Sequence, residues 1–165
     1  MPPISVGDCL PSIDLYEGIS DNIAVAGKII NLADICKNKK VVIFGVPGAF
    51  TPGCSKTHLP GFIERANNLK AKGVNEIICV SVNDPFVMTA WGKLNKAGGK
   101  VRMLADPCGA LAKALDLAMT DVVPILGNLR FKRFSLVAVN GKVTQINAEE
   151  DETGLTCSLA SILKI

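Results

Sequence analysis

Residues 41–58 read VVIFGVPGAFTPGCSKTH, and this stretch decides how the rest of the chain is organised. Residues 41–46 are almost continuously apolar and rich in β-branched side chains, which predicts a strand buried on both faces. Thr51 then stands where a helix N-cap belongs, and Pro52 where the first helical residue belongs. Cys54 is therefore expected on the first turn of a helix that follows a buried strand.

This position predicts a reactive thiol at Cys54. The first turn of a helix presents unpaired backbone N–H groups and the positive end of the helix dipole, and both favour an anion. A cysteine there tends to have a lowered pKa and to exist partly as the thiolate, which attacks electrophiles. The alternative is that Cys54 is one more small buried apolar side chain, as most free cysteines are.

Length and composition indicate one globular domain of 165 residues, with 48% hydrophobic and 20% charged residues and a net charge of +3. Neither a basic stripe nor an aromatic-rich motif is present, which disfavours nucleic-acid binding. Apolar runs fall well short of the roughly 20 residues that cross a bilayer, so no membrane partner is expected. The first residues lack the core of a signal peptide, which favours a cytoplasmic protein.

The six cysteines form no C-x-x-C pair and are unevenly spaced: Cys9, Cys36, Cys54, Cys79, Cys108 and Cys157. This spacing argues against a zinc site and against a dithiol of the thioredoxin type. It is also unlike the disulfide framework of a small secreted protein. A reducing compartment with one or two chemically special thiols is the best interpretation, and no metal or other cofactor is expected.

The remaining elements follow from periodicity and turn signals. Residues 1–30 predict short strands or an N-terminal hairpin, with an apolar stretch at residues 23–25, and Asn31 is expected to cap a short helix. The other expected elements are a helix to residue 72, strands at 76–82 and 101–104, helices at 86–96 and 110–117, an irregular loop at 118–130, a hairpin of 133–139 with 142–147, and a terminal helix at 158–163. Strand, helix and strand between 41 and 82 predict a parallel βαβ unit.

The segment FGVPGAFTPGCSKTHLPGF at residues 44–62 resembles the active-site segment of peroxiredoxins, in particular the type-five, atypical two-cysteine subgroup and the plant type-II enzymes. The similarity continues through residues 79–86, 91–92, 105–107, 132–135 and 154–160, nearly the whole chain. It implies a thioredoxin-like α/β fold, with a central mixed sheet, flanking helices and an N-terminal extension. It also implies a homodimeric peroxidase for hydrogen peroxide and alkyl hydroperoxides, regenerated by thioredoxin or a similar dithiol. Family members occur in several compartments, so mitochondrial or peroxisomal pools are compatible with it.

Peroxide reduction assigns roles around Cys54. The thiolate would attack the near oxygen and become a sulfenic acid. Thr51 would bridge sulfur and peroxide, Pro47 would keep water off the sulfur, and Gly48 and Gly53 are the expected substrate-binding positions, with the N–H groups of Gly53 and Cys54 facing the developing charge.

A cation near the sulfur is also expected. From the residues alone, Arg130, Lys132 and Arg133 are equal candidates near the start of the hairpin. The resemblance assigns Arg133, with Arg130 as a supporting partner.

Two further assignments remain open in the sequence. Cys157 matches the resolving cysteine of the type-five subgroup and Cys79 that of the plant type-II enzymes; Cys157 is favoured because it lies in a glycine-containing loop, whereas Cys79 lies in a predicted buried strand. His58, four residues after Cys54, is expected to play a supporting or surface role. The alternatives to a two-cysteine peroxidase are a one-cysteine enzyme that uses an external thiol, a non-catalytic thioredoxin-fold redox sensor and, more distantly, a cysteine hydrolase with His58 as its base.

Overall fold

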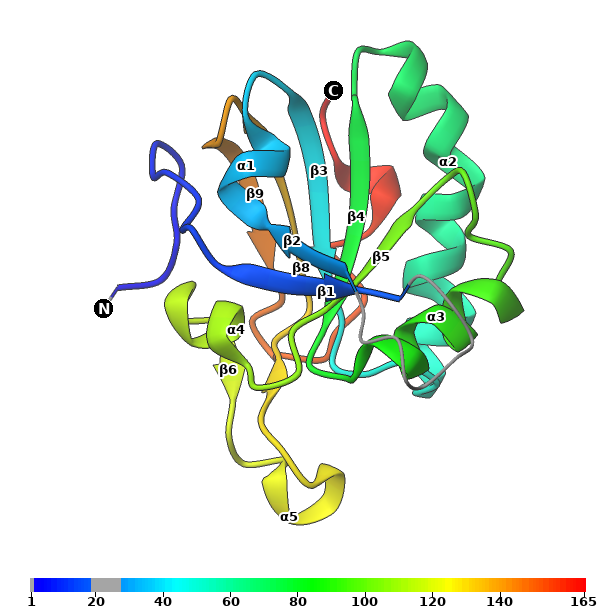
Figure 1. The fold of residues 1–165 in the computed structure, drawn as a ribbon, viewed down its shortest axis with the longest axis vertical. Coiled ribbons are helices and arrows are strands. Elements are labelled where there is room, and N and C mark those ends of the chain that lie inside the picture. The colour runs from blue at the N-terminus through cyan, green and yellow to red at the C-terminus, as the bar shows by residue number, and fades with distance from the viewer. Residues whose placement is uncertain (1, 19–27) are drawn as a thin grey trace.

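A seven-stranded mixed sheet forms the centre of the computed structural model, which describes residues 2–18 and 28–165 (Figure 1). The strand order is β2-β1-β5-β4-β3-β8-β9. The strands are β1 Asp14–Glu17, β2 Lys28–Asn31, β3 Lys40–Gly45, β4 Glu76–Ser81, β5 Arg102–Ala105, β8 Phe134–Val139 and β9 Lys142–Ala148. The predicted mixed α/β fold is confirmed, as is the N-terminal hairpin, because β1 and β2 pair antiparallel. The apolar stretch at residues 23–25 lies outside the described residues.

Strands β3 and β4 are the buried centre of the sheet. They pair in parallel with Ile43 opposite Ile78, and helix α2 (Leu59–Ala71) makes the crossover between them. The predicted βαβ unit is therefore confirmed. On its other side β3 pairs antiparallel with β8, which places Gly45 opposite Phe134. The loop of residues 46–54, which follows β3, therefore starts next to the first residue of β8.

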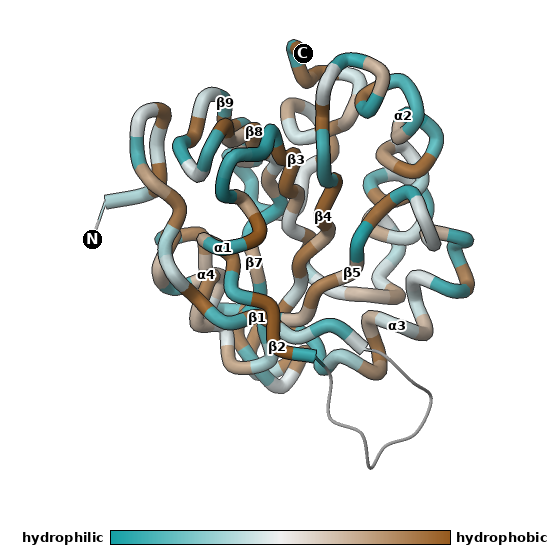
Figure 2. The backbone as a smooth tube through the Cα atoms, turned by 45° about the horizontal axis from the view of Figure 1, so that its top comes forward, coloured by the Kyte–Doolittle hydropathy of each residue, from teal (hydrophilic) through white to brown (hydrophobic). Residues whose placement is uncertain are grey.

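Helices cover both faces of this sheet, because alternate residues of β3 point to opposite sides. Val42 and Phe44 face one apolar cluster, which contains residues of α2, of α3 (Pro85–Leu94) and of the 3-10 turn η2 (Ala160–Ile162). Val41 and Ile43 face the other, with α1 (Leu32–Cys36) and α4 (Ala110–Ala114). Figure 1 shows α2 and α3 on one side of the sheet and α1 and α4 on the other. In Figure 2 the hydrophobic colour follows β3 and β4, whereas α2 alternates between hydrophilic and hydrophobic colour.

Two local predictions are confirmed by backbone geometry. Asn31 caps α1, because its side chain accepts a hydrogen bond from the Asp34 N–H. Asn140 and Gly141 have φ values of 49° and 77°, as a type I′ turn requires, and they join β8 to β9. The residues before β1 also run beside β9, where Gly7 N–H donates to the Val143 carbonyl at 2.9 Å.

The irregular loop predicted for residues 118–130 is wrong in detail. This segment contains β6 (Ala118–Met119) paired with β7 (Arg130–Phe131), and between them the single turn α5 (Val123–Leu126). Elements of two and four residues are too short to show a periodic apolar pattern. In Figure 1, α5 projects from the body of the fold. The paired strands β6 and β7 connect α5 to that body.

Candidate active site

Cys54 is fully buried at a widened turn of helix. The sequence predicted a regular helix from Pro52, whereas residues Cys54–His58 form a π-helical turn, η1, which continues into α2. The Leu59 N–H donates to the Cys54 carbonyl, five residues back. Such turns are rare and are frequently found at functional sites. Propensity gives no signal for this one, so the sequence missed it.

Two donors converge on the Cys54 sulfur. Thr51 Oγ1 lies 2.9 Å from it and Arg133 Nη1 lies 3.3 Å from it. Thr51 Oγ1 is also 2.7 Å from the Gly48 carbonyl oxygen. A hydroxyl has one hydrogen. It therefore donates to Gly48 while the thiol is protonated, and it is free to donate to the sulfur of a thiolate.

Arg133 is buried, 3% exposed, and directed at the sulfur by several contacts. Its Nε donates to the Thr153 carbonyl at 3.3 Å, and Nη1 lies 3.3 Å from His58 Nδ1. Within residues 2–18 and 28–165, no ion pair joins Arg133 to a carboxylate. Its positive charge is thus left to stabilise negative charge at the sulfur.

His58 is a buried support for Arg133. Its Nε2 donates to the Ser158 carbonyl at 3.0 Å, which leaves Nδ1 as the acceptor for the guanidinium. Burial is the main cause that lowers the pKa of His58 to about 4, so the ring is neutral at pH 7. A surface position is therefore wrong. The hydrolase alternative loses its base, because both ring nitrogens have partners other than Cys54.

Gly48 and Gly53 let two arginines approach the loop closely. A Cβ at Gly48 would lie 2.8 Å from Arg130 Nη1, and one at Gly53 would lie 3.1 Å from Arg133 Nη2. Arg130 donates to the Pro47 carbonyl at 3.4 Å and to the Leu126 carbonyl at 3.1 Å. It thereby links the loop after β3 to α5.

Three supporting residues were missed by sequence reasoning. Asn83 Oδ1 accepts from the Ala49 N–H at 3.0 Å and from Ser81 Oγ at 2.5 Å, which fixes the loop before Thr51. Trp91, on α3, donates from Nε1 to Ser55 Oγ at 3.0 Å. These residues lie 25 or more positions beyond Cys54, and only the β4–α3 geometry brings them to it.

All six cysteines are free thiols. The two candidate resolving cysteines, Cys79 and Cys157, differ in their surroundings. Cys79 is fully buried in β4 beside Phe44, and burial raises its pKa well above the ordinary value. Cys157 is half-buried in the loop after β9. Its pKa is raised too, first by burial and then by the charge of Glu149.

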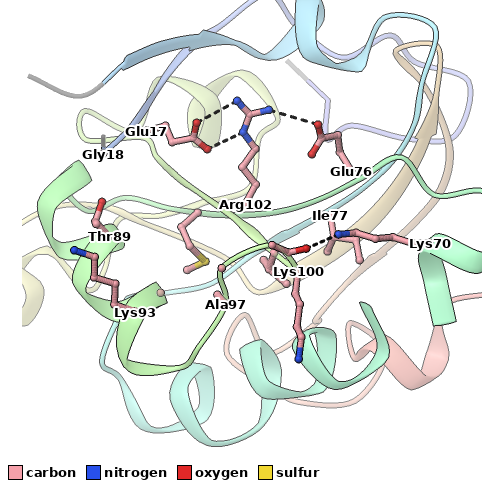
Figure 3. A pocket seen from close by; sticks show the side chains of 15 residues that line it. Glu17, Gly18, Lys70, Glu76, Ile77, Thr89, Lys93, Ala97, Lys100 and Arg102 are labelled. Atoms are coloured by element: carbon pink, nitrogen blue, oxygen red, sulfur yellow. Dashed lines mark hydrogen bonds and ion pairs between the residues drawn. The ribbon is translucent and has the colours of Figure 1, made fainter. Parts of the chain in front are cut away.

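A separate pocket of about 530 Å³ contains none of the predicted site residues (Figure 3). It lies between α3, β5 and the end of α2, and three lysines and Arg102 line it. The Arg102 guanidinium forms ion pairs with Glu17 at 2.7 Å and with Glu76 at 3.6 Å. In the described part of the chain, no three His, Cys, Asp or Glu side chains gather closely enough to hold a metal ion. None of the described helices has the length and apolar character needed to span a membrane.

The comparisons with known proteins agree with this geometry. Residues 5–163 match the model of the Redoxin family. The chain is 46% identical to peroxiredoxin-2C of Oryza sativa subsp. japonica, over 99% of both chains. This chain is a peroxiredoxin of the redoxin family. Arabidopsis thaliana peroxiredoxin-2B is 44% identical, again over 99% of both chains.

Solved peroxiredoxins share the whole fold. Reduced Prx3 of Vibrio vulnificus in complex with hydrogen peroxide is 41% identical, with a TM-score of 0.87 over 96% of both chains. Peroxiredoxin 5 of Alvinella pompejana is 36% identical, with a TM-score of 0.79 over 92% of this chain and 93% of that one. The thioredoxin-like fold implied by the resemblance is therefore confirmed. The relatives make this peroxiredoxin a thiol-dependent peroxidase, an oxidoreductase.

Proposed function

We propose that this peroxiredoxin reduces hydrogen peroxide and alkyl hydroperoxides through Cys54, that Cys157 resolves the product, and that thioredoxin or a similar dithiol recycles the enzyme. The observation that carries the proposal is the pair of donors, Thr51 Oγ1 and Arg133 Nη1, on one buried sulfur. A buried thiol that served only for packing would not need a guanidinium beside it.

In the first step the Cys54 thiolate attacks the nearer peroxide oxygen. The S–O bond forms as the O–O bond breaks, and the departing oxygen takes a proton and leaves as water or an alcohol. Arg133 stabilises the negative charge as it moves from sulfur to the departing oxygen. Thr51 holds the peroxide against the sulfur, the loop from Pro47 through Gly48 walls the site, and Gly53 presents its N–H on the first turn of helix.

In the second step the Cys157 thiol attacks the Cys54 sulfenic acid. The S–S bond forms, the S–O bond breaks, and the hydroxyl leaves as water with the thiol proton. The half-buried position of Cys157 in a loop supports this choice over Cys79, which is fully buried and fixed in β4. A dithiol of the thioredoxin type then reduces the disulfide by thiol exchange.

A homodimer fits an apolar surface next to the site. Phe50, in the loop before Thr51, is 52% exposed, and Ile125 on α5 is 86% exposed. Arg130 connects these two segments through the carbonyls of Pro47 and Leu126. We propose that a second copy covers this surface, and Ile125→Asp is expected to shift the sedimentation coefficient from a dimer to a monomer.

Single-cysteine variants test the catalytic proposal. Both variants are assayed with hydrogen peroxide in the presence of thioredoxin, thioredoxin reductase and NADPH. Cys54→Ser is expected to consume no peroxide. Cys157→Ser is expected to consume one equivalent of peroxide and then to stop. Full thioredoxin-dependent turnover by Cys157→Ser would instead assign resolution to Cys79 or to an external thiol. Peroxide consumption by Cys54→Ser at the parent rate would sink the proposal.

A further inference from the structure

The carboxylate of Glu149 is buried, 3% exposed, and accepts hydrogen bonds from the segment that carries Cys157. It accepts four hydrogen bonds from N–H and O–H groups, namely the backbone N–H and the hydroxyl of Thr156 and the same two groups of Ser158. Thr156 and Ser158 flank Cys157 directly. One carboxylate therefore holds both neighbours of the proposed resolving cysteine.

Glu149 also faces the Cys157 thiol. The sulfur lies 3.5 Å from Glu149 Oε2 and 3.4 Å from the Ala148 carbonyl oxygen, so the thiol proton has an acceptor in either direction. A carboxylate beside a thiol opposes its ionisation, because the two negative charges repel. The same side chain thus restrains the segment and disfavours the nucleophilic form of its cysteine.

Three hydrogen bonds connect the restrained segment to His58 and Arg133 of the candidate active site. The Ser158 carbonyl accepts from His58, whose other ring nitrogen faces Arg133. The Thr153 carbonyl accepts directly from Arg133 Nε, and the Glu149 N–H donates to the Arg133 carbonyl at 2.9 Å. Movement of this segment toward Cys54 therefore has to break contacts that also position Arg133.

We propose that Glu149 is a positioning residue that holds Cys157 back in the reduced enzyme and so sets the rate of disulfide formation. This inference rests on the proposed function, because it assigns Cys157 the resolving role. The step it controls is the attack of the Cys157 sulfur on the Cys54 sulfenic acid, with loss of water. When this disulfide forms slowly, the Cys54 sulfenic acid stays exposed to a second peroxide molecule, which would oxidise it to the sulfinic acid.

Trp91 offers a direct readout, because it is the single tryptophan of the chain and donates to Ser55, the residue after Cys54. Reduced enzyme is mixed with excess hydrogen peroxide in a stopped-flow fluorimeter. A first phase whose rate is proportional to peroxide reports sulfenic acid formation, and a second phase independent of peroxide reports disulfide formation. Peptide mapping of quenched samples assigns each phase.

The test compares Glu149→Gln with Glu150→Gln, which removes an equal charge from the adjacent exposed side chain. Loss of one or more net hydrogen bonds predicts a second phase about three- to tenfold faster in Glu149→Gln. Its first phase is expected to stay within about twofold of the parent, and Glu150→Gln is expected to match the parent in both phases. A second phase in Glu149→Gln that is equal to or slower than in the parent would overturn the proposal.

Ser158→Ala separates restraint from charge, because it removes one hydrogen bond and keeps the carboxylate. It is expected to accelerate the second phase as well, and a parent-like rate would overturn the restraint. In a Cys54→Ser background, iodoacetamide should also label Cys157 about threefold faster when Glu149 is replaced by Gln. This labelling remains informative if Glu149→Gln changes the first phase.

The outcomes distinguish this inference from the proposed function. If the parent enzyme forms no disulfide between Cys54 and Cys157, the proposed resolving role is wrong and the role of Glu149 falls with it. If the parent forms that disulfide and Glu149→Gln does not accelerate it, only the role of Glu149 is overturned.

Discussion

The guanidinium of Arg133 lies 3.3 Å from the sulfur of Cys54, although 79 positions separate the two residues in the chain. The antiparallel pairing of β3 with β8 creates this contact, because it brings the start of β8 to the end of β3, where the loop to Cys54 begins. His58 and the Thr153 carbonyl fix the guanidinium of Arg133 in this position through hydrogen bonds. A guanidinium so fixed costs little reorganisation when charge develops at the sulfur.

Replacing Arg133 by Lys tests whether geometry matters in addition to charge. Lysine keeps a positive charge but lacks the planar fork that contacts Cys54, His58 and Thr153 together. We expect kcat/KM for hydrogen peroxide to fall about 10²- to 10³-fold. Lys132→Met is the matched control, since the Lys132 ammonium forms a 3.8 Å ion pair with Glu152 rather than a contact with the Cys54 sulfur. Equal activity of Arg133→Lys and the parent would remove Arg133 from the mechanism.

Thr51→Val removes the hydroxyl beside the Cys54 sulfur with almost no change in shape. A hydrogen bond to a charged group contributes about 1.5–3 kcal/mol, so the second-order rate constant with peroxide should fall about 10- to 100-fold. Thr51→Ser keeps the hydroxyl and should recover most of that rate. The contrast between the two variants is the measurement, and equal rates in both would contradict a role for the hydroxyl.

Gly53→Ala should impair catalysis more than stability. The new methyl group would lie 3.1 Å from Arg133 Nη2 and 3.3 Å from Leu155 Cδ1, so it would press on a guanidinium fixed by other contacts. We expect kcat/KM to fall about tenfold, with a melting temperature within a few degrees of the parent. Gly61→Ala is the control, because its Cβ would meet no atom within 4 Å. A parent-like kcat/KM in Gly53→Ala would show that Arg133 tolerates the displacement.

Stability should fall as pH is lowered from 6.5 to 4. The pKa of His58 drops from its ordinary 6.5 to about 4 in the folded protein, chiefly because the ring is buried. Between these values the unfolded chain binds the proton and the folded chain does not, so lowering the pH favours unfolding by up to about 3 kcal/mol. His58 is the only histidine of the chain, and urea unfolding at pH 7 and pH 5 samples the range in which the folded and unfolded chains differ in its protonation.

His58→Gln is the control for this pH effect. It should lose the slope between pH 6.5 and 4. The pKa of Glu149 is about 2 because the hydrogen bonds from Thr156 and Ser158 outweigh the effect of burial, which alone would raise it. Its contribution to stability is therefore present above pH 4.5 and is lost as the pH falls from 4.5 toward 2, mostly below the range in which His58 acts. The same slope in His58→Gln and in the parent would contradict the assignment to His58.

Much of the fold was predictable because its decisive signals are local. The apolar run of β3, the apolar β4 strand and the Asn140-Gly141 turn each specify an element within about ten residues. Residues 118–131 were not predictable in the same way. Their two-residue strands are stabilised by each other across the segment, not by their own sequence pattern.

In the candidate site, too, contacts between residues close in sequence were predictable and contacts between distant residues were not. Cys54 and Thr51 lie within one turn of helix, so their spacing alone predicts that they meet. The choice of Arg133 over Arg130 required the family resemblance, because strand register decides which guanidinium reaches the sulfur. The bonds from His58 to Ser158 and from Ser158 to Glu149 span 100 and 9 positions, and no short motif encodes either of them.

The most direct test of the whole account is the mass of fully reduced enzyme before and after one equivalent of hydrogen peroxide, with peptide mapping under non-reducing conditions. The account predicts the loss of two hydrogens and a single new link between the Cys54 and Cys157 peptides. A protein whose Cys54 peptide is unchanged after peroxide has been added would contradict it.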